Sequence, residues 1–144
     1  MQVYFEDVQP GDELEPFIKV PSKEEVVAFA RLALLDGRFV DDEEARKEGM
    51  DGVIVSSWQS MAYLSQLITN WMGPQGFLSK FEVYLRRIVE PGDRLECRAI
   101  VTDTAVASER NVVVLDIYIE NQRGEKPLQG MAEVFLPSRP NNQL

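Results

Sequence analysis

The chain has 144 residues, a length that suits a single domain. It has one cysteine and no histidine, so an internal disulfide, Ser-His-Asp catalysis and Cys-His catalysis are excluded. Few ligands remain for a transition metal. Its 15 basic and 24 acidic residues give a net charge of −9, which disfavours nucleic acid and anionic membrane as partners. We therefore expect no metal or other cofactor, and the lone thiol favours a reducing, cytoplasmic location.

The first third of the chain predicts two extended segments and a helix. Residues 4–8 and 13–20 read as extended, separated by a turn. Ser22 and Glu25 have the spacing of a capping box, and apolar residues at helical spacing follow them. These signals predict a helix over residues 23–35.

A stretch without any charge occupies the middle of the chain, between Asp51 and Lys80. After a short helix expected at residues 41–47, this stretch predicts a long helix over residues 54–72, which at ~1.5 Å per residue spans roughly 28 Å. A helix that is apolar around most of its circumference is expected to be buried. Its many Ser, Thr, Asn and Gln residues argue against a membrane span.

The remaining sequence reads as strands, over residues 77–89, 95–101, 111–120 and 128–136. The fold class predicted is α+β: a curved antiparallel sheet wrapped around one long central helix, which is the hot-dog arrangement. We expect one such domain over residues 1–137 and a polar tail over residues 138–144. An open sheet edge would remain, so a dimer is expected to cover it.

Two segments of the chain echo each other, residues 8–15 and 89–96. Both contain Val, then Pro-Gly-Asp, then Leu-Glu. Because the rest of the sequence shows no period, we interpret the echo as the same turn chemistry used twice rather than as a repeat architecture. In the strand that follows the second segment, Cys97 points inward with Leu95 and Ala99. It is therefore expected to be buried and unreactive.

The segment from Phe29 to Trp58 resembles the MaoC-like branch of hot-dog proteins, the (R)-specific enoyl-CoA hydratases and dehydratases. Residues 34–41 occupy, without gaps, that family's pattern D-x-N-P-(I/L)-H-x-D. Residues 52–58 occupy its loop G-x-(I/V)-(V/A)-H-G before the central helix, and residues 87–95 resemble its strand-turn-strand. The layout matches over nearly the whole chain, whereas the identities are few.

The departures from the family pattern fall on its chemistry. The family's aspartate and histidine activate the water that adds to an enoyl thioester, and here they fall on Leu34 and Phe39, neither of which can move a proton. The glycine whose N–H polarises the thioester carbonyl falls on Ser57. The resemblance therefore implies that Ser56, Ser57 and Trp58 keep a thioester-binding groove whose acid/base pair is missing.

Other residues are candidates for contacts with the ligand. Arg38, Arg86 and Arg87 could meet the phosphates of a coenzyme A or carrier-protein arm, or be ordinary surface cations. Trp58, Tyr63 and Trp71 could line an acyl tunnel, although core packing is the commoner role of aromatic residues on such a helix.

Four functions remain open at this point. The first is an acyl-thioester-binding subunit, a homodimer or a heteromer with a homologous hot-dog chain that supplies catalysis. The second is an active hydro-lyase that uses Asp36 or Asp41 as a reassigned base, its pKa raised by apolar neighbours. The third is a non-enzymatic module for a hydrophobic ligand. A thioesterase is disfavoured because the central helix bears no acid.

Overall fold

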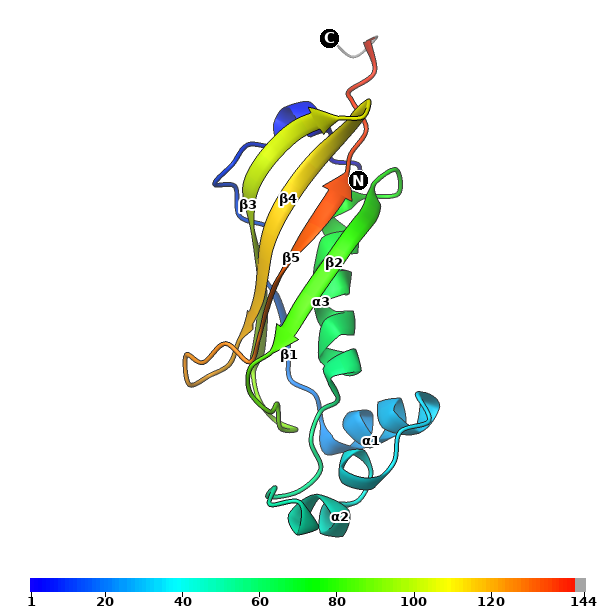
Figure 1. The fold of residues 1–144 in the computed structure, drawn as a ribbon, viewed down its shortest axis with the longest axis vertical. Coiled ribbons are helices and arrows are strands. Elements are labelled where there is room, and N and C mark those ends of the chain that lie inside the picture. The colour runs from blue at the N-terminus through cyan, green and yellow to red at the C-terminus, as the bar shows by residue number, and fades with distance from the viewer. Residues whose placement is uncertain (142–144) are drawn as a thin grey trace.

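The computed structural model describes residues 1–141 of the chain (Figure 1). In chain order the elements of this part are η1 (Phe5–Asp7), β1 (Phe17–Lys19), α1 (Lys23–Leu32), η2 (Gly37–Phe39), α2 (Asp42–Lys47), α3 (Ser57–Met72), β2 (Phe77–Leu85), β3 (Leu95–Ala107), β4 (Arg110–Glu120) and β5 (Leu128–Phe135), where η marks a short 3-10 helix.

The strands form one antiparallel sheet in the order β1-β3-β4-β5-β2. The sheet curves, and α3 lies along its concave side (Figure 1). Helices α1 and α2 gather at the end of the molecule where α3 begins. This arrangement confirms the predicted α+β hot-dog fold with one central helix.

The core lies between α3 and the sheet. Alternate residues of β4 point toward the helix and are buried, from Val113 to Ile119, as the period of two in their sequence predicts. Leu64 and Ile68 of α3 meet them and are fully buried. Cys97 is also fully buried, which confirms its predicted place among apolar residues.

Helix α3 differs from its prediction in where it starts and in how far it is covered. It begins at Ser57 rather than at residue 54, because Val55 pairs with Val89 as an isolated β-bridge and Ser56 caps the helix. The sheet covers only one side of the helix. Trp58 is 58% exposed, and Ala62, Gln66 and Thr69 continue an exposed, uncharged stripe along it.

The prediction of the first two extended segments is largely wrong. Residues 5–7 form η1 instead of a strand. Of residues 13–20, the regular strand comprises only β1, and Glu13 adds a single bridge to Ile100. These segments meet the sheet only at isolated places, and Leu14, whose N–H donates to the carbonyl of Ala99, is the one buried residue between Glu13 and Val20.

The capping box of α1 is present, but the helix ends at Leu32 rather than at residue 35. Leu34 has a φ of 60°, a left-handed conformation that cannot continue a right-handed helix.

Two strands differ in length from their predictions. Strand β2 ends at Leu85 instead of residue 89, and the N–H of the next residue, Arg86, donates to the carbonyl of Pro127. Strand β3 is longer than predicted and reaches Ala107.

The two echoing segments form the same turn. Asp12 accepts a hydrogen bond from the N–H of Gln9 at 2.9 Å, and Asp93 accepts one from the N–H of Glu90 at 2.9 Å. The glycine before each aspartate has a positive φ, 96° in the first turn and 89° in the second. Repeated turn chemistry therefore accounts for the echo.

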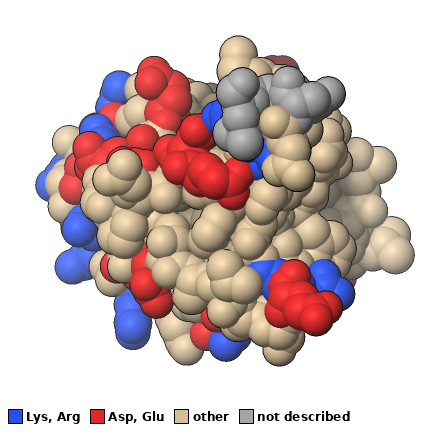
Figure 2. All heavy atoms as spheres, turned by 90° about the horizontal axis from the view of Figure 1, so that it is seen from above, with Lys and Arg blue, Asp and Glu red and all other residues tan. Residues whose placement is uncertain are grey.

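The surface is mixed in charge at the end that carries the last described residues. Seen from above the view of Figure 1, acidic and basic residues lie side by side in groups around a broad uncharged area (Figure 2). Residues 142–144 of the expected tail lie outside the described residues, while Arg139 pairs with Asp7. Within residues 1–141, no helix has the length and apolarity needed to span a bilayer.

Candidate functional site

The start of α3 is joined to the loop that precedes α2. The N–H of Ile54 donates to the carbonyl of Arg38 at 3.1 Å, so this loop lies against the strand-like entry to the helix. Ser56 caps the helix, since its Oγ accepts from the N–H of Gln59 at 3.2 Å. The backbone N–H groups of Ser57 and Trp58 have no acceptor among residues 1–141. They form an electropositive helix end.

The two positions that the resemblance assigns to the acid/base pair carry hydrocarbon side chains. Leu34 is 92% exposed. Phe39 is half-buried, and the guanidinium of Arg38 lies over its ring at 5.0 Å from the centroid. Neither Leu34 nor Phe39 has a group that can donate or accept a proton.

The nearby carboxylates hold the local backbone together. Asp41 caps α2, with its Oδ1 accepting from the N–H of Glu43 at 2.8 Å and of Glu44 at 3.2 Å. Asp42 pairs with Lys23 and accepts from the N–H of Val53 at 2.9 Å.

The hydrogen bond from Lys23, followed by that from the Val53 N–H, lowers the pKa of Asp42. Asp36 is exposed at the start of η2 and makes no side-chain capping bond. The geometry therefore gives Asp41 and Asp42 structural roles and brings neither of them into a catalytic pair.

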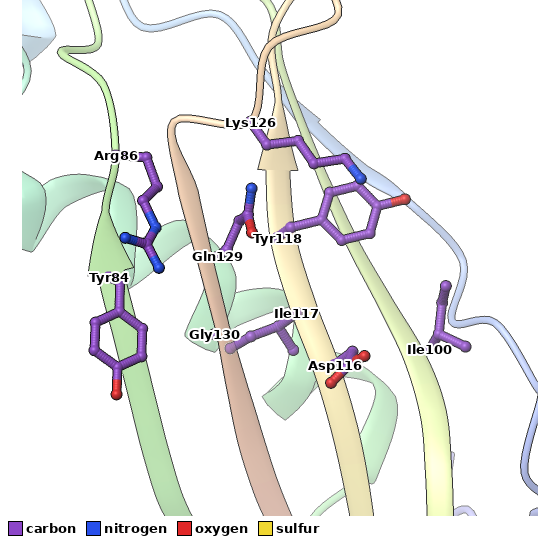
Figure 3. Close-up of a pocket in the computed structure, with 9 residues that line it drawn as sticks. All are labelled: Tyr84, Arg86, Ile100, Asp116, Ile117, Tyr118, Lys126, Gln129 and Gly130. Atoms are coloured by element: carbon purple, nitrogen blue, oxygen red, sulfur yellow. The ribbon is translucent and has the colours of Figure 1, made fainter.

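The three arginine candidates lie in different surroundings. Arg38 pairs with Glu48 at 2.9 Å, and its buried Nε has no partner in the described chain. Arg87 pairs with Glu125 at 3.3 Å. Arg86 follows the end of β2 and lies over Tyr84 on the face of the sheet away from α3 (Figure 3). Among them only Arg38 is in contact with the helix entry, through its backbone.

A buried polar cluster in the first turns of α3 was missed by sequence reasoning. The amide of Gln59 donates to the hydroxyl of Tyr63 at 2.7 Å, and both side chains are buried. Burial raises the pKa of Tyr63, and the bond from Gln59 opposes that rise. Gln59 Oε1 and Ser60 Oγ have no partner among residues 1–141. The signal was present in the polar residues of the helix, which the sequence analysis used only to exclude a membrane.

The aromatic candidates divide between surface and core. Tyr63 is buried and Trp71 packs against the core, as their commoner role predicts, but Trp58 lies largely in solvent. Five hollows stand out on the surface of the described chain, and none is lined by Phe39, Ser57 or Trp58.

Within residues 1–141, no three His, Cys, Asp or Glu side chains come together as metal ligands. The groups that the site does offer are two backbone N–H donors, a half-buried phenyl ring, an exposed indole and the Arg38 guanidinium. Of these, the two N–H donors can stabilise a polarised carbonyl. None of these groups is a general base.

Several solved structures are similar to this chain in architecture. Among solved structures, a MaoC-like dehydratase from Rhodospirillum rubrum shares 24% identity and a TM-score of 0.85, covering 96% of this chain and 99% of that one. The unliganded R-hydratase PhaJ1 from Pseudomonas aeruginosa shares 20% identity and a TM-score of 0.85, covering 96% and 88%. The ChsH1-ChsH2 complex from Mycobacterium tuberculosis shares 16% identity and a TM-score of 0.78, covering 89% and 98%.

These likenesses establish the fold. No curated protein sequence matches the chain. The family model described as MaoC like domain matches residues 39–122, which is more than half of the 144 residues. The match begins at Phe39, spans α3 and the Pro91-Gly92-Asp93 turn, and ends within the β4–β5 connection. The chain therefore belongs to the MaoC-like domain family of hydratase and dehydratase proteins.

Proposed function

We propose that the chain is an acyl-thioester-binding subunit of the hydratase/dehydratase type that lacks the acid/base pair. It binds the thioester of coenzyme A or of a carrier protein at the start of α3. A second chain, either another copy or a homologous hot-dog protein, completes the slot, and in the heteromer that homologue supplies the catalytic residues.

The observation that carries the proposal is the start of α3 itself, together with the hydrocarbon at the two positions that the resemblance assigns to the acid/base pair. The N–H groups of Ser57 and Trp58 are free of acceptors within the described chain and point out of the first turn. A thioester carbonyl that accepts both bonds would gain from the helix dipole as well. Leu34 and Phe39 offer apolar contact but no proton transfer.

The need for a second chain rests on exposed surface. Trp58 and Leu34 are apolar and largely in solvent, and the outer edge of β2 has no neighbouring strand within residues 1–141. Exposed apolar side chains and an unpaired strand edge each favour association. The ChsH1-ChsH2 structure, which has the same fold, is itself a complex of two chains.

Ser57 allows a direct test of the N–H contact. It is the first helical residue, where proline is tolerated, and the preceding Ser56 already has φ −67° and ψ 150°, which a following proline favours. Ser57→Pro removes the N–H and should weaken the binding of octanoyl-CoA, measured by calorimetry, by roughly tenfold or more.

The matched control is Ser57→Ala, which keeps the N–H and should bind within about twofold of the unchanged chain. Equal binding by the proline variant, with its helix content retained in circular dichroism, would show that the thioester does not use this N–H. Loss of binding in both variants would point to the serine hydroxyl instead and would also contradict the proposal.

The competing hydro-lyase would use Asp36 or Asp41 as its base. The capping bonds of Asp41 and the exposure of Asp36 favour the binding role over this one. Asp36→Asn and Asp41→Asn, assayed separately for hydration of crotonyl-CoA, distinguish the two. Activity in the unchanged chain that either substitution abolishes would establish the hydro-lyase and overturn our proposal.

A further inference from the structure

The largest of the five hollows lies on the outer face of the sheet, opposite α3, and has a volume of about 520 Å³ (Figure 3). Six side chains define it: Tyr84, Arg86, Asp116, Tyr118, Lys126 and Gln129. They come from β2, β4, β5 and the turns beside these strands. The thioester site lies on the other side of the sheet, so this hollow is separate from it.

Strand register explains the floor and the walls of the hollow. Tyr84 is opposite Gln129, and Gln129 is opposite Tyr118, so the three side chains form one row across β2, β5 and β4. Strands lie ~4.8 Å apart, which places the two tyrosine side chains about 10 Å apart at their bases, with the amide of Gln129 between them. Such a row offers a broad aromatic and amide platform at the surface.

Two cations flank this platform, Arg86 on the side of Tyr84 and Lys126 on the side of Tyr118 (Figure 3). Arg86 lies over the Tyr84 ring at 5.5 Å and Lys126 over the Tyr118 ring at 4.5 Å. Neither forms an ion pair with a carboxylate in the described chain, whereas the neighbouring Arg87 does. Stacking on the rings holds both cations in place with their charge unneutralised.

We propose that this hollow binds an aromatic ring that carries a phosphate, the chemistry of a nucleotide. Arg86 binds the phosphate by the paired N–H groups that suit it, and Lys126, on the other side of Gln129, adds a second positive charge to the hollow. The ring lies over Gln129, between the two tyrosines. Asp116, exposed at the opposite end, would repel an anionic group there and so orients the ligand with its phosphate toward the cations.

The test uses AMP as the probe, with the full chain labelled for NMR. AMP should shift the side-chain amide of Gln129 and the backbone amide of Gly130, which also lines the hollow. Arg86→Gln and Lys126→Gln should each weaken binding by roughly tenfold, and the control Lys80→Gln, an exposed cation of β2 that does not line the hollow, should leave it unchanged. No binding of AMP at millimolar concentration, or equal binding by all variants, would overturn the proposal.

Two further probes test the ring and the phosphate separately. Ribose 5-phosphate lacks the ring and adenosine lacks the phosphate, so both should bind more weakly than AMP. Ribose 5-phosphate binding as tightly as AMP would show that the platform is unused and would also overturn the proposal.

Coenzyme A contains the same adenosine phosphate chemistry, and competition identifies the source of the ligand. If coenzyme A displaces AMP from Gln129, the hollow takes the nucleotide end of the carrier. If both bind together, it takes a separate nucleotide. Both results support the hollow as a site, and because no substitution here touches Ser57, its failure would leave the proposed thioester binding standing.

Discussion

Leu34 combines two features that are unfavourable in a single copy of the chain. Its φ of 60° is a left-handed conformation that costs an L-residue about 1 kcal/mol, and its side chain is 92% exposed. Glycine would relieve the backbone strain, and a polar residue would suit the exposure. Under the proposed function, the thioester or a second chain would cover this leucine.

Leu34→Gly should stabilise the isolated fold while weakening binding. We expect the free energy of unfolding to rise by about 0.5–1 kcal/mol in urea titrations, because the left-handed strain is removed. The control is Leu32→Gly, since Leu32 is similarly exposed but lies in α1, where glycine should cost about 1 kcal/mol. A destabilised Leu34→Gly would show that the leucine already supports the fold of one copy.

Asp42 should make stability depend on acid pH. Its bonds to Lys23 and to the Val53 N–H lower its pKa below the ordinary value of 3.8, so the folded state binds this proton less readily than the unfolded chain. The stabilisation is present above the unfolded pKa and is lost as pH falls through the lower folded value.

In Asp42→Asn this loss should be absent, so the difference in urea midpoint between variant and unchanged chain should shrink below pH ~4. A pH-independent difference for Asp42→Asn would contradict the assigned bonds.

At the scale of elements, the helices and strands that depend on local sequence signals were predicted correctly where those signals were present. Alternation predicted β4, and the Ser22–Glu25 spacing predicted the start of α1. The extension of β3 was missed because its turn to β4 uses Ser108 and Glu109 at φ 52° and 64°, without the Asn or Gly that normally marks such a turn.

The start of α3 was missed for a different reason, because the apolar residues before Ser56 fit a strand as well as a helix. Only the pairing of Val55 with Val89, a contact between distant parts of the chain, settles which they adopt.

Among the described glycines, Gly130 has the least room for a side chain. A Cβ built on it would lie 1.9 Å from the carbonyl oxygen of Glu82, because β2 and β5 approach closely there. Gly130→Ala should therefore cost at least ~2 kcal/mol in the free energy of unfolding.

The control is Gly124→Ala in the turn between β4 and β5. Gly124 has a φ of 76° but open space around it, so only backbone strain applies and the cost should be about 1 kcal/mol. Equal costs for the two variants would mean that the sheet can shift to admit the extra methyl group.

At the scale of the whole molecule, the architecture was predictable and the site was predictable only in part. The alternation of strands and the uncharged helix were sufficient for the fold. The sequence did not predict which side of α3 stays open, because the helix reads as apolar all round. Only the width of the five-stranded sheet decides how much of the helix is covered. The hollow with Tyr118 and Lys126 was likewise missed, since it depends on register across three strands.

The open side of α3 predicts self-association or pairing. Trp58→Glu should shift the chain toward the monomer in light scattering coupled to size exclusion, because it places a charge in the proposed interface. Tyr84→Glu is the matched control, since Tyr84 is 56% exposed and Trp58 58%, but Tyr84 lies on the outer face of the sheet. A chain that is monomeric before either change, and stays so with a homologous hot-dog chain, would contradict the need for a partner.

The most direct test measures thioester binding and hydration on one sample of the purified chain. Crotonyl-CoA is titrated by calorimetry, and its enoyl absorbance is then followed at saturating chain. We predict saturable binding with no hydration above the rate without protein, because Leu34 and Phe39 stand where the proton-transferring pair would be. Saturable hydration by the chain alone, or no binding of the thioester at all, would contradict the proposed function.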